Sequence, residues 1–275
     1  MLGYLIYHPE EVERNRRFID FFLTAASRRG IGLELITTDQ IACGIRGGKP
    51  FFLPQTPDFA VVRAMLPALS GHLEACGARV FNNAFLSEIC NDKQKTQAYL
   101  TARGIPMLDT AFVSPACPRQ PFPYPIVVKA SAGCGGRQVF LCRDEAEYRE
   151  KLSLIFPDSA VVQPLCDTPG RDVRAYVLGN TIIQAMLRYT DDDFRSNFGL
   201  HGSAKTHELT DGERALIERV IPLFDIGLVG IDLIYHGGQP YVNEVEDAVG
   251  TRMLYQYTDL DIVDLYMDLI VKKMA

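Results

Sequence analysis

Residues 230–247 read Gly-Ile-Asp-Leu-Ile-Tyr-His-Gly-Gly-Gln-Pro-Tyr-Val-Asn-Glu-Val-Glu-Asp, which is the pattern of a β-hairpin. Two runs rich in β-branched and aromatic residues flank the turn-forming residues 236–240. If the chain folds back about Gly238, Ile234 pairs with Val242 in an antiparallel register. The stretch therefore predicts two paired strands near the carboxyl end of the chain.

Three carboxylates of this hairpin fall on one face in that register. Asp232 lies opposite Glu244, and Glu246 follows on the same face because side chains alternate along a strand. Like charges that face each other are destabilising, so a bound cation would explain them. Mg²⁺ suits such a site, because it takes one or two carboxylates and completes its coordination with water and phosphate oxygens. A solvated acidic face shows the same alternation, so other residues must decide.

A strand that ends in lysine runs into a glycine-rich loop upstream of the hairpin. Residues 126–129 read Ile-Val-Val-Lys, and residues 130–136 read Ala-Ser-Ala-Gly-Cys-Gly-Gly. The backbone of such a loop can close over phosphates, and Lys129 supplies a charge for their oxygens. Because the lysine precedes the glycines, neither the Walker motif nor the dinucleotide-binding G-x-G-x-x-G pattern fits. Taken alone, the loop is also compatible with a plain flexible turn.

Three further motifs lie between Asn82 and Gly250. Residues 91–93 read Asn-Asp-Lys, residues 170–174 read Gly-Arg-Asp-Val-Arg, and residues 193–197 read Asp-Phe-Arg-Ser-Asn. With the loop and the acidic hairpin, these motifs resemble the ATP-grasp superfamily, and within it the RimK-like amino-acid ligases. The resemblance implies ATP and Mg²⁺ as cofactors, with Mn²⁺ as an alternative metal.

The resemblance assigns roles to residues of each motif. It implies nucleotide contacts, including a main-chain adenine hinge at 162–165, for Lys93, Lys129, Gly133, Gly135, Gly136, Gln163, Pro164, Leu165 and Asp172. It implies contacts with the reacting groups for Arg174, Arg188, Arg195 and Asn197. It implies metal binding for Asp232, Glu244 and Glu246.

The chain departs from the family pattern at one metal position. The family usually reads E-x-N-x-S-P-G, whereas residues 244–250 read Glu-Val-Glu-Asp-Ala-Val-Gly, so Glu246 replaces an asparagine. The added charge is expected to tighten metal binding or to mark an altered reaction. Residues 1–81 match only in general style, so the substrates do not follow from the resemblance.

The expected architecture is α/β, with a small parallel N-terminal domain followed by an α+β ATP-grasp fold of two subdomains. The predicted domains are 1–88, 89–160 and 161–275. In the first, strands are expected at 2–7, 32–36, 59–63 and 79–81, with helices at about 12–29 and 66–76. Beyond it, helices are expected at 92–102, 144–154 and 211–221 and from Asp261 on, strands at 126–129 and 160–163, and hairpins at 173–187 and 231–245.

Composition and charge exclude several classes of protein. With 275 residues, 47% of them hydrophobic, and a net charge of −6, the chain is typical of a globular protein without a broad basic field for nucleic acid or membrane surfaces. No stretch reaches the roughly 18 apolar residues of a membrane span. Seven cysteines without a C-x-x-C pair suggest neither a disulfide framework nor a zinc site, which favours a cytoplasmic protein.

The predicted activity is ATP-dependent joining of a carboxylate to an amine through an acyl phosphate. The partners would be small-molecule or peptide substrates, and a homo-oligomer is left open. Two alternatives remain, namely an ATP-binding regulatory module without turnover and a kinase-like phosphotransferase. Arg195 and Asn197 favour the ligase, and Glu246 keeps the alternatives open.

Overall fold

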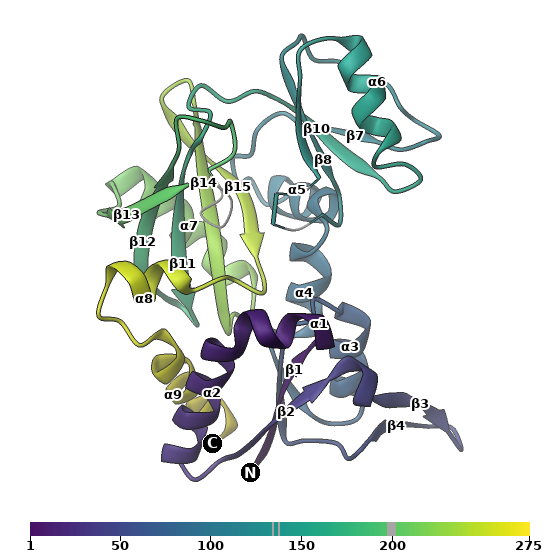
Figure 1. The fold of residues 1–275 in the computed structure, drawn as a ribbon, viewed down its shortest axis with the longest axis vertical. Coiled ribbons are helices and arrows are strands. Elements are labelled where there is room, and N and C mark those ends of the chain that lie inside the picture. Colours follow the sequence, from purple (N-terminus) through teal and green to yellow (C-terminus); the bar gives the residue numbers. More distant parts are fainter. Residues whose placement is uncertain (134, 137, 197–201) are drawn as a thin grey trace.

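The computed structural model of the chain describes residues 1–133, 135–136, 138–196 and 202–275. Within these residues the strands form a four-stranded parallel sheet, a four-stranded antiparallel sheet, a five-stranded antiparallel sheet and a separate two-stranded hairpin (Figure 1). Helices pack between and around the sheets. The predicted α/β class and the α+β character of the second part are confirmed.

The N-terminal sheet has the strand order β2-β1-β5-β6. Its strands are β1 (Leu2–Tyr7), β2 (Gly32–Thr37), β5 (Phe59–Val62) and β6 (Arg79–Phe81), and its connecting helices include α2 (Arg16–Arg28) and α3 (Pro67–Ala75). Parallel strands require such crossover connections, which also bury the apolar strands β1 and β5. All four strands and both helices agree closely with the predicted ones.

A hairpin of β3 (Ala42–Arg46) and β4 (Lys49–Leu53) extends from this N-terminal unit (Figure 1). This hairpin was not predicted from the sequence. Only Phe52 of the hairpin is buried, and it packs into the core beneath the parallel sheet.

The central sheet has the order β7-β10-β8-β9, and helix α6 covers one face. Its elements are β7 (Ala111–Val113), β8 (Ile126–Ala130), β9 (Val139–Cys142), α6 (Glu145–Ser153) and β10 (Ala160–Pro164). Helices α4 (Ala84–Cys90) and α5 (Lys93–Thr101) lead into it from the N-terminal unit. Because β8 pairs with β9, the glycine-rich loop is the connection of a hairpin and leaves the sheet at the end of β8.

The C-terminal sheet has the order β13-β12-β11-β14-β15. Its elements are β11 (Arg171–Leu178), β12 (Thr181–Tyr189), β13 (Ser203–His207), α7 (Asp211–Val220), β14 (Leu228–His236) and β15 (Gln239–Glu246), followed by α8 (Arg252–Tyr257) and α9 (Ile262–Met274). Helix α7 begins at a capping box of Thr210 and Glu213 and packs on the apolar face of the sheet. The opposite face carries the charged side chains that line the site, and its Tyr176 and Met186 pack into the core shared with the N-terminal sheet.

The register of the acidic hairpin agrees with the prediction at one pair and differs at the other. Asp232 lies opposite Glu244 as predicted, but Ile234 pairs with Tyr241 rather than with Val242. The turn consists of Gly237 and Gly238, so its centre lies half a residue earlier than expected. A β-bulge in β15 adds one residue and restores the predicted pairing of the two acids.

Helices α8 and α9 return to the N-terminal unit, where α9 lies against α2 (Figure 1). They share one core with the N-terminal sheet and with part of the C-terminal sheet, whereas the central sheet has a core of its own. The three predicted domains remain a proposal; sheet membership would extend the second to Pro164, the last residue of β10. No helix of the described residues is long and apolar enough to cross a membrane.

Candidate active site

A cleft of about 820 Å³ lies between the central sheet, the charged face of the C-terminal sheet and the N-terminal unit. All but two of the predicted site residues line it. Asp232 is fully buried beneath the cleft surface, and Asn197 lies outside the described residues. The motifs are far apart in sequence, so their convergence on one cleft is a result of the tertiary structure.

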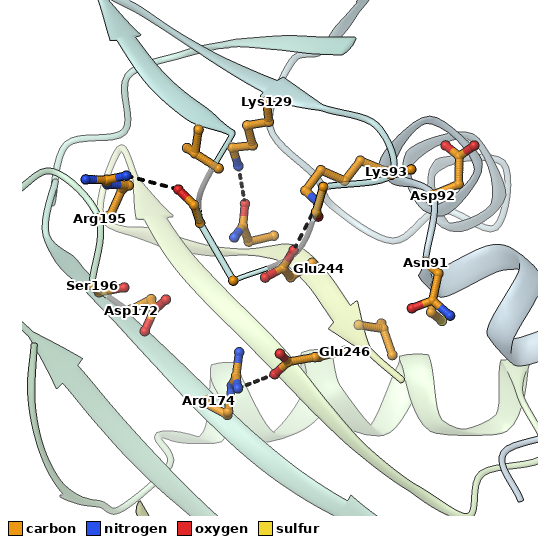
Figure 2. A pocket seen from close by; sticks show the side chains of 18 of the residues that line it. Asn91, Asp92, Lys93, Lys129, Asp172, Arg174, Arg195, Ser196, Glu244 and Glu246 are labelled. Atoms are coloured by element: carbon orange, nitrogen blue, oxygen red, sulfur yellow. Dashed lines mark hydrogen bonds and ion pairs between the residues drawn. The ribbon is translucent and has the colours of Figure 1, made fainter. Parts of the chain in front are cut away.

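Lys93 approaches the cleft from the first turn of α5. Asp92 caps this helix by accepting hydrogen bonds from the backbone of Gln94 and Lys95. Lys93 Nζ donates to the carbonyl oxygen of Gly133 at 2.6 Å and lies 3.9 Å from Glu244 Oε2. The lysine thus connects the glycine-rich loop to the acidic hairpin (Figure 2).

Lys129 approaches from the end of β8. Its Nζ donates to Asn243 Oδ1 at 2.8 Å, so its partner is neutral. Burial lowers the pKa of Lys129 to about 8, although the charge of Glu244 opposes this shift. A partly buried ammonium that has no carboxylate in hydrogen-bond contact within the described residues favours an anionic ligand.

Two arginines and two aspartates form a buried network on the charged face of the C-terminal sheet. Arg174 Nε and Nη2 donate to the two oxygens of Asp232, both at 2.7 Å. Arg188 Nε and Nη2 donate to Asp172 at 2.6 and 2.5 Å, and Nη2 also donates to Asp232 at 2.6 Å. The pairs form because Arg174 lies opposite Asp232 and Arg188 lies opposite Asp172 in the sheet.

The network keeps Asp232 ionised. Burial disfavours its charge, but the charges of Arg174 and Arg188 and their hydrogen bonds outweigh burial and hold the pKa of this carboxyl well below its usual range. Removing one partner from such a buried network typically costs about 3–5 kcal/mol, because the other charge is left uncompensated. The network therefore fixes both guanidinium groups beneath the cleft.

Glu244 and Glu246 point from β15 toward the cleft (Figure 2). Each side chain is 34% exposed. Glu246 pairs with Arg174 Nη1. Desolvation raises the pKa of Glu246; Arg174 opposes this shift, and the charges of Asp232 and Glu244 reinforce it.

These two glutamates fit a divalent cation that also takes ligands from a nucleotide. In the described parts of the chain, no group of three or more His, Cys, Asp and Glu side chains is arranged to hold a metal ion by itself. Mg²⁺ needs only one or two protein carboxylates when phosphates supply the rest. Asp232 already accepts three hydrogen bonds, which leaves one of its roughly four lone pairs, so metal binding by Asp232 stays a prediction.

The predicted adenine hinge borders the cleft, but one of its side chains turns away. Gln163 is 2% exposed and donates from Nε2 to Thr110 Oγ1 at 2.9 Å. Pro164 and Leu165 line the cleft directly. Base recognition here would use main-chain groups, as the resemblance implied.

Arg195 connects the Asp-Phe-Arg segment with the glycine-rich loop. Its Nη1 donates to the carbonyl oxygen of Gly136 at 3.0 Å, while Nη2 pairs with Asp193 at 2.6 Å. Asp193 thus fixes the guanidinium group of Arg195, which belongs to the same Asp-Phe-Arg segment. The arginine is thereby held beside the glycine-rich loop.

Sequence reasoning missed two groups of residues. Asn243, the partner of Lys129, is the extra residue of the bulge, and no turn or charge pattern indicates a bulge there. The N-terminal unit supplies a wall of the cleft through His8, Glu10, Glu11, Arg14, Ala64 and Met65. These residues follow the carboxyl ends of β1 and β5, which is where open α/β sheets bind ligands, so this wall was predictable.

Comparison with known proteins finds a matching family model and similar proteins named as synthases and ligases. The model of the RimK-like ATP-grasp domain matches residues 90–270. N-acetylaspartylglutamate synthase A of Mus musculus is 30% identical over 269 residues, covering 88% of this chain and 70% of that protein. A probable alpha-L-glutamate ligase of Vibrio atlanticus is 25% identical over 268 residues, covering 90% of this chain and 89% of that protein.

The fold is also that of a solved synthetase. The crystal structure of the D-cycloserine synthetase DcsG superposes with a TM-score of 0.76, at 15% identity, over 100% of both chains. At this identity the likeness concerns the fold alone.

Proposed function

The chain belongs to the RimK-like ATP-grasp family, and from this premise we propose that it uses ATP and Mg²⁺ to join a carboxylate to an amine through an acyl phosphate. The family and its named ligases support an ADP-forming carbon–nitrogen ligase. The observation that carries the proposal is the cleft itself, where Lys93 and Lys129 face Glu244 and Glu246. Cations for phosphate and carboxylates for a metal thus meet in one site.

The residues of the cleft divide into three roles in this proposal. Lys93 and Lys129 bind phosphate oxygens, since phosphoryl transfer depends mainly on positioning and charge. Glu244 and Glu246 hold the metal, which when bound neutralises phosphate charge. The main chain at Pro164 and Leu165 receives the base.

The reaction would proceed in two displacements. An oxygen of the substrate carboxylate attacks the γ-phosphorus, the bond to the β-phosphate oxygen breaks, and ADP leaves. The neutral amine then attacks the carbonyl carbon of the acyl phosphate, inorganic phosphate leaves, and the amine loses a proton. Arg188 would stabilise the oxyanion; in support of this role, its Nη1 donates to no other residue of the described chain.

The two loops joined by Arg195 would keep water from the acyl phosphate. Arg195 holds Gly136 from the side of the Asp-Phe-Arg segment, and Lys93 holds Gly133 from the opposite side. Excluding water prevents hydrolysis of the reactive intermediate. Asn197 would contribute to the same region, as the motif predicts.

We propose L-glutamate as the first amine substrate to test, because the names of two relatives include glutamate. The carboxylate substrate would be a small acid or a peptide. The N-terminal wall of the cleft, which the family motifs do not cover, would select between them.

The test is release of ADP with Mg²⁺ present, with L-glutamate and other amino acids and peptides supplied singly and in pairs. We expect turnover that requires two co-substrates and is lost in Lys129→Ala. Lys151→Ala, which changes a lysine of α6 outside the cleft, should retain it. A stable phosphorylated product from one co-substrate would indicate a kinase, and bound ATP without ADP release from any pair would indicate a regulatory module.

A further inference from the structure

Asp247, the residue after Glu246, is a buried carboxylate with an unusual set of partners. It is 4% exposed. Its Oδ1 accepts from Asn82 Nδ2 at 2.8 Å, and its Oδ2 accepts from Asn91 Nδ2 at 3.0 Å. Both donors are neutral amides, so geometry rather than charge neutralisation determines this contact.

Asn82 is itself held rigidly. Its Oδ1 accepts from the backbone N–H groups of Gly227 and Leu228 at 2.7 and 3.1 Å. Its Nδ2 also donates to the carbonyl oxygens of Leu228 and Asp247 at 2.9 and 3.1 Å. Asn82 thus joins the end of β6 to the start of β14 and to the residue after β15.

A second side chain of the N-terminal unit supports the same segment. Arg63, just after β5, donates from Nη2 to the carbonyl oxygens of Ala248 and Val249 at 3.1 and 2.8 Å. The backbone that follows Glu246 is therefore held from the carboxyl ends of two N-terminal strands. Among the residues of this segment, Asp247 also accepts a side-chain hydrogen bond from Asn91, which lines the cleft.

The hydrogen bond between Asn91 and Asp247 connects two segments that carry residues of the site. Asn91 ends helix α4 and stands two residues before Lys93. Asp247 directly follows Glu246. A hydrogen bond between Asn91 and Asp247 therefore sets the spacing between a phosphate-binding lysine and a metal-binding glutamate.

We propose that Asp247 is a positioning residue that holds Lys93 and Glu246 at the separation that a metal–triphosphate complex requires. This role rests on the proposed function and assigns a task to a residue that the family motifs leave open. Asp247 is buried and is not among the described residues that line the cleft. It acts through Asn91 on one side and through its own backbone on the other.

The test compares nucleotide binding by Asp247→Ala, Asp247→Asn and Asp261→Ala. Asp247→Ala removes both acceptors. Asp247→Asn keeps one oxygen that can accept from Asn82. Its new amide group can donate to Asn91 if the Asn91 amide rotates so that its oxygen faces residue 247. Asp261 caps α9 and accepts two hydrogen bonds away from the cleft, so Asp261→Ala is a control for lost stability alone.

Calorimetric titration with Mg·ATP, and with ATP in a chelator, provides the readout, together with KM, kcat and the thermal midpoint. We expect Asp247→Ala to raise the Kd and the KM for Mg·ATP by about tenfold or more, because the variant loses both side-chain acceptors that hold Asn82 and Asn91. The effect on ATP without metal should be smaller. Asp247→Asn should return to within about threefold of the unchanged protein, and Asp261→Ala should lower only the thermal midpoint.

The role would be overturned if Asp247→Ala bound Mg·ATP like the unchanged protein, if Asp261→Ala weakened binding equally, or if Asp247→Asn rescued nothing. If Asp247→Ala does not fold, Asn91→Ala removes the link to Asp247 together with the hydrogen bond to Ser87 and leaves the contact of Asp247 with Asn82 in place. Normal Mg·ATP affinity in that variant contradicts the role. Failure of the unchanged protein to bind Mg·ATP would instead reject the proposed function.

Discussion

Lys129 shows how burial gives one residue its chemical character. Its ammonium lies at the end of an apolar strand and has an amide oxygen as its hydrogen-bond partner. The arginines of the neighbouring sheet are more deeply buried, but each is matched by carboxylates. Among these cations, Lys129 thus gains most from a bound phosphate, because its charge is the least compensated.

The lowered pKa of Lys129 predicts a pH dependence of nucleotide binding. Only the protonated amine attracts phosphate, so its contribution is present below about pH 8 and is lost as the pH rises through that value. From pH 7 to pH 9, kcat/KM for ATP should fall by about tenfold, since that ratio reports the free enzyme. Lys129→Gln should have a lower but nearly flat profile, and an unchanged slope in this variant would assign the titration to another group.

The acidic hairpin shows how a single element orients the site. Its turn residues, Gly237 and Gly238, have φ values of +57° and +71°, which a two-residue turn of the primed type requires. The bulge at Asn243 then allows Val242 to face the core while Glu244 faces the cleft. Without the extra residue these two side chains, two positions apart, would point to the same face.

The turn predicts that two substitutions at Gly237 differ in their effect on the free energy of unfolding. Valine is strained at positive φ, so Gly237→Val should lower the free energy of unfolding by about 1–2 kcal/mol. Asparagine tolerates this conformation, so Gly237→Asn should change stability little. Urea titration of both variants tests this, and equal stability of the two would contradict the turn geometry.

At the scale of the whole molecule, the first and last parts of the chain share one core. Helix α9 contributes Ile270 and its neighbours to a cluster that contains Leu5 of β1 and Tyr176 of β11. The central sheet is packed separately around Val128 and Tyr148. We therefore expect the N-terminal unit and the C-terminal sheet to depend on each other for stability, and the central sheet to be more independent.

Ile270→Ala tests this division, because Ile270 is fully buried in the shared core. The substitution should cost about 2–5 kcal/mol and reduce hydrogen-exchange protection in both β1 and β11, with less effect on β8 and β10. As a control, Asp268 lies on the same helix as Ile270 and forms an ion pair at the surface with Arg29, which follows α2. Asp268→Ala removes this pair and should cost no more than about 1 kcal/mol. Equal loss of protection in all three sheets would indicate a single cooperative unit.

The sequence alone was sufficient for most of the elements and for the family, although it did not predict α4, α8, β7, β9 or β13. Its short apolar runs predicted the N-terminal strands closely, and the alternation of side chains within residues 230–247 placed Asp232 opposite Glu244. It missed the hairpin of β3 and β4 and shifted the register around Val242. Periodicity reports which face a residue takes, whereas turn centres and bulges depend on single residues.

Tertiary structure decided how the charged residues of the site are used. The sequence could group Asp232 with Glu244 and Glu246, but only the strand order β12-β11-β14 places Asp232 between two arginines. Similarly, no local pattern connects Asp247 with Asn82 or Asn91. Local sequence fixes conformation and side-chain alternation, while the pairing of charges distant in the chain depends on which strands and helices come to lie side by side.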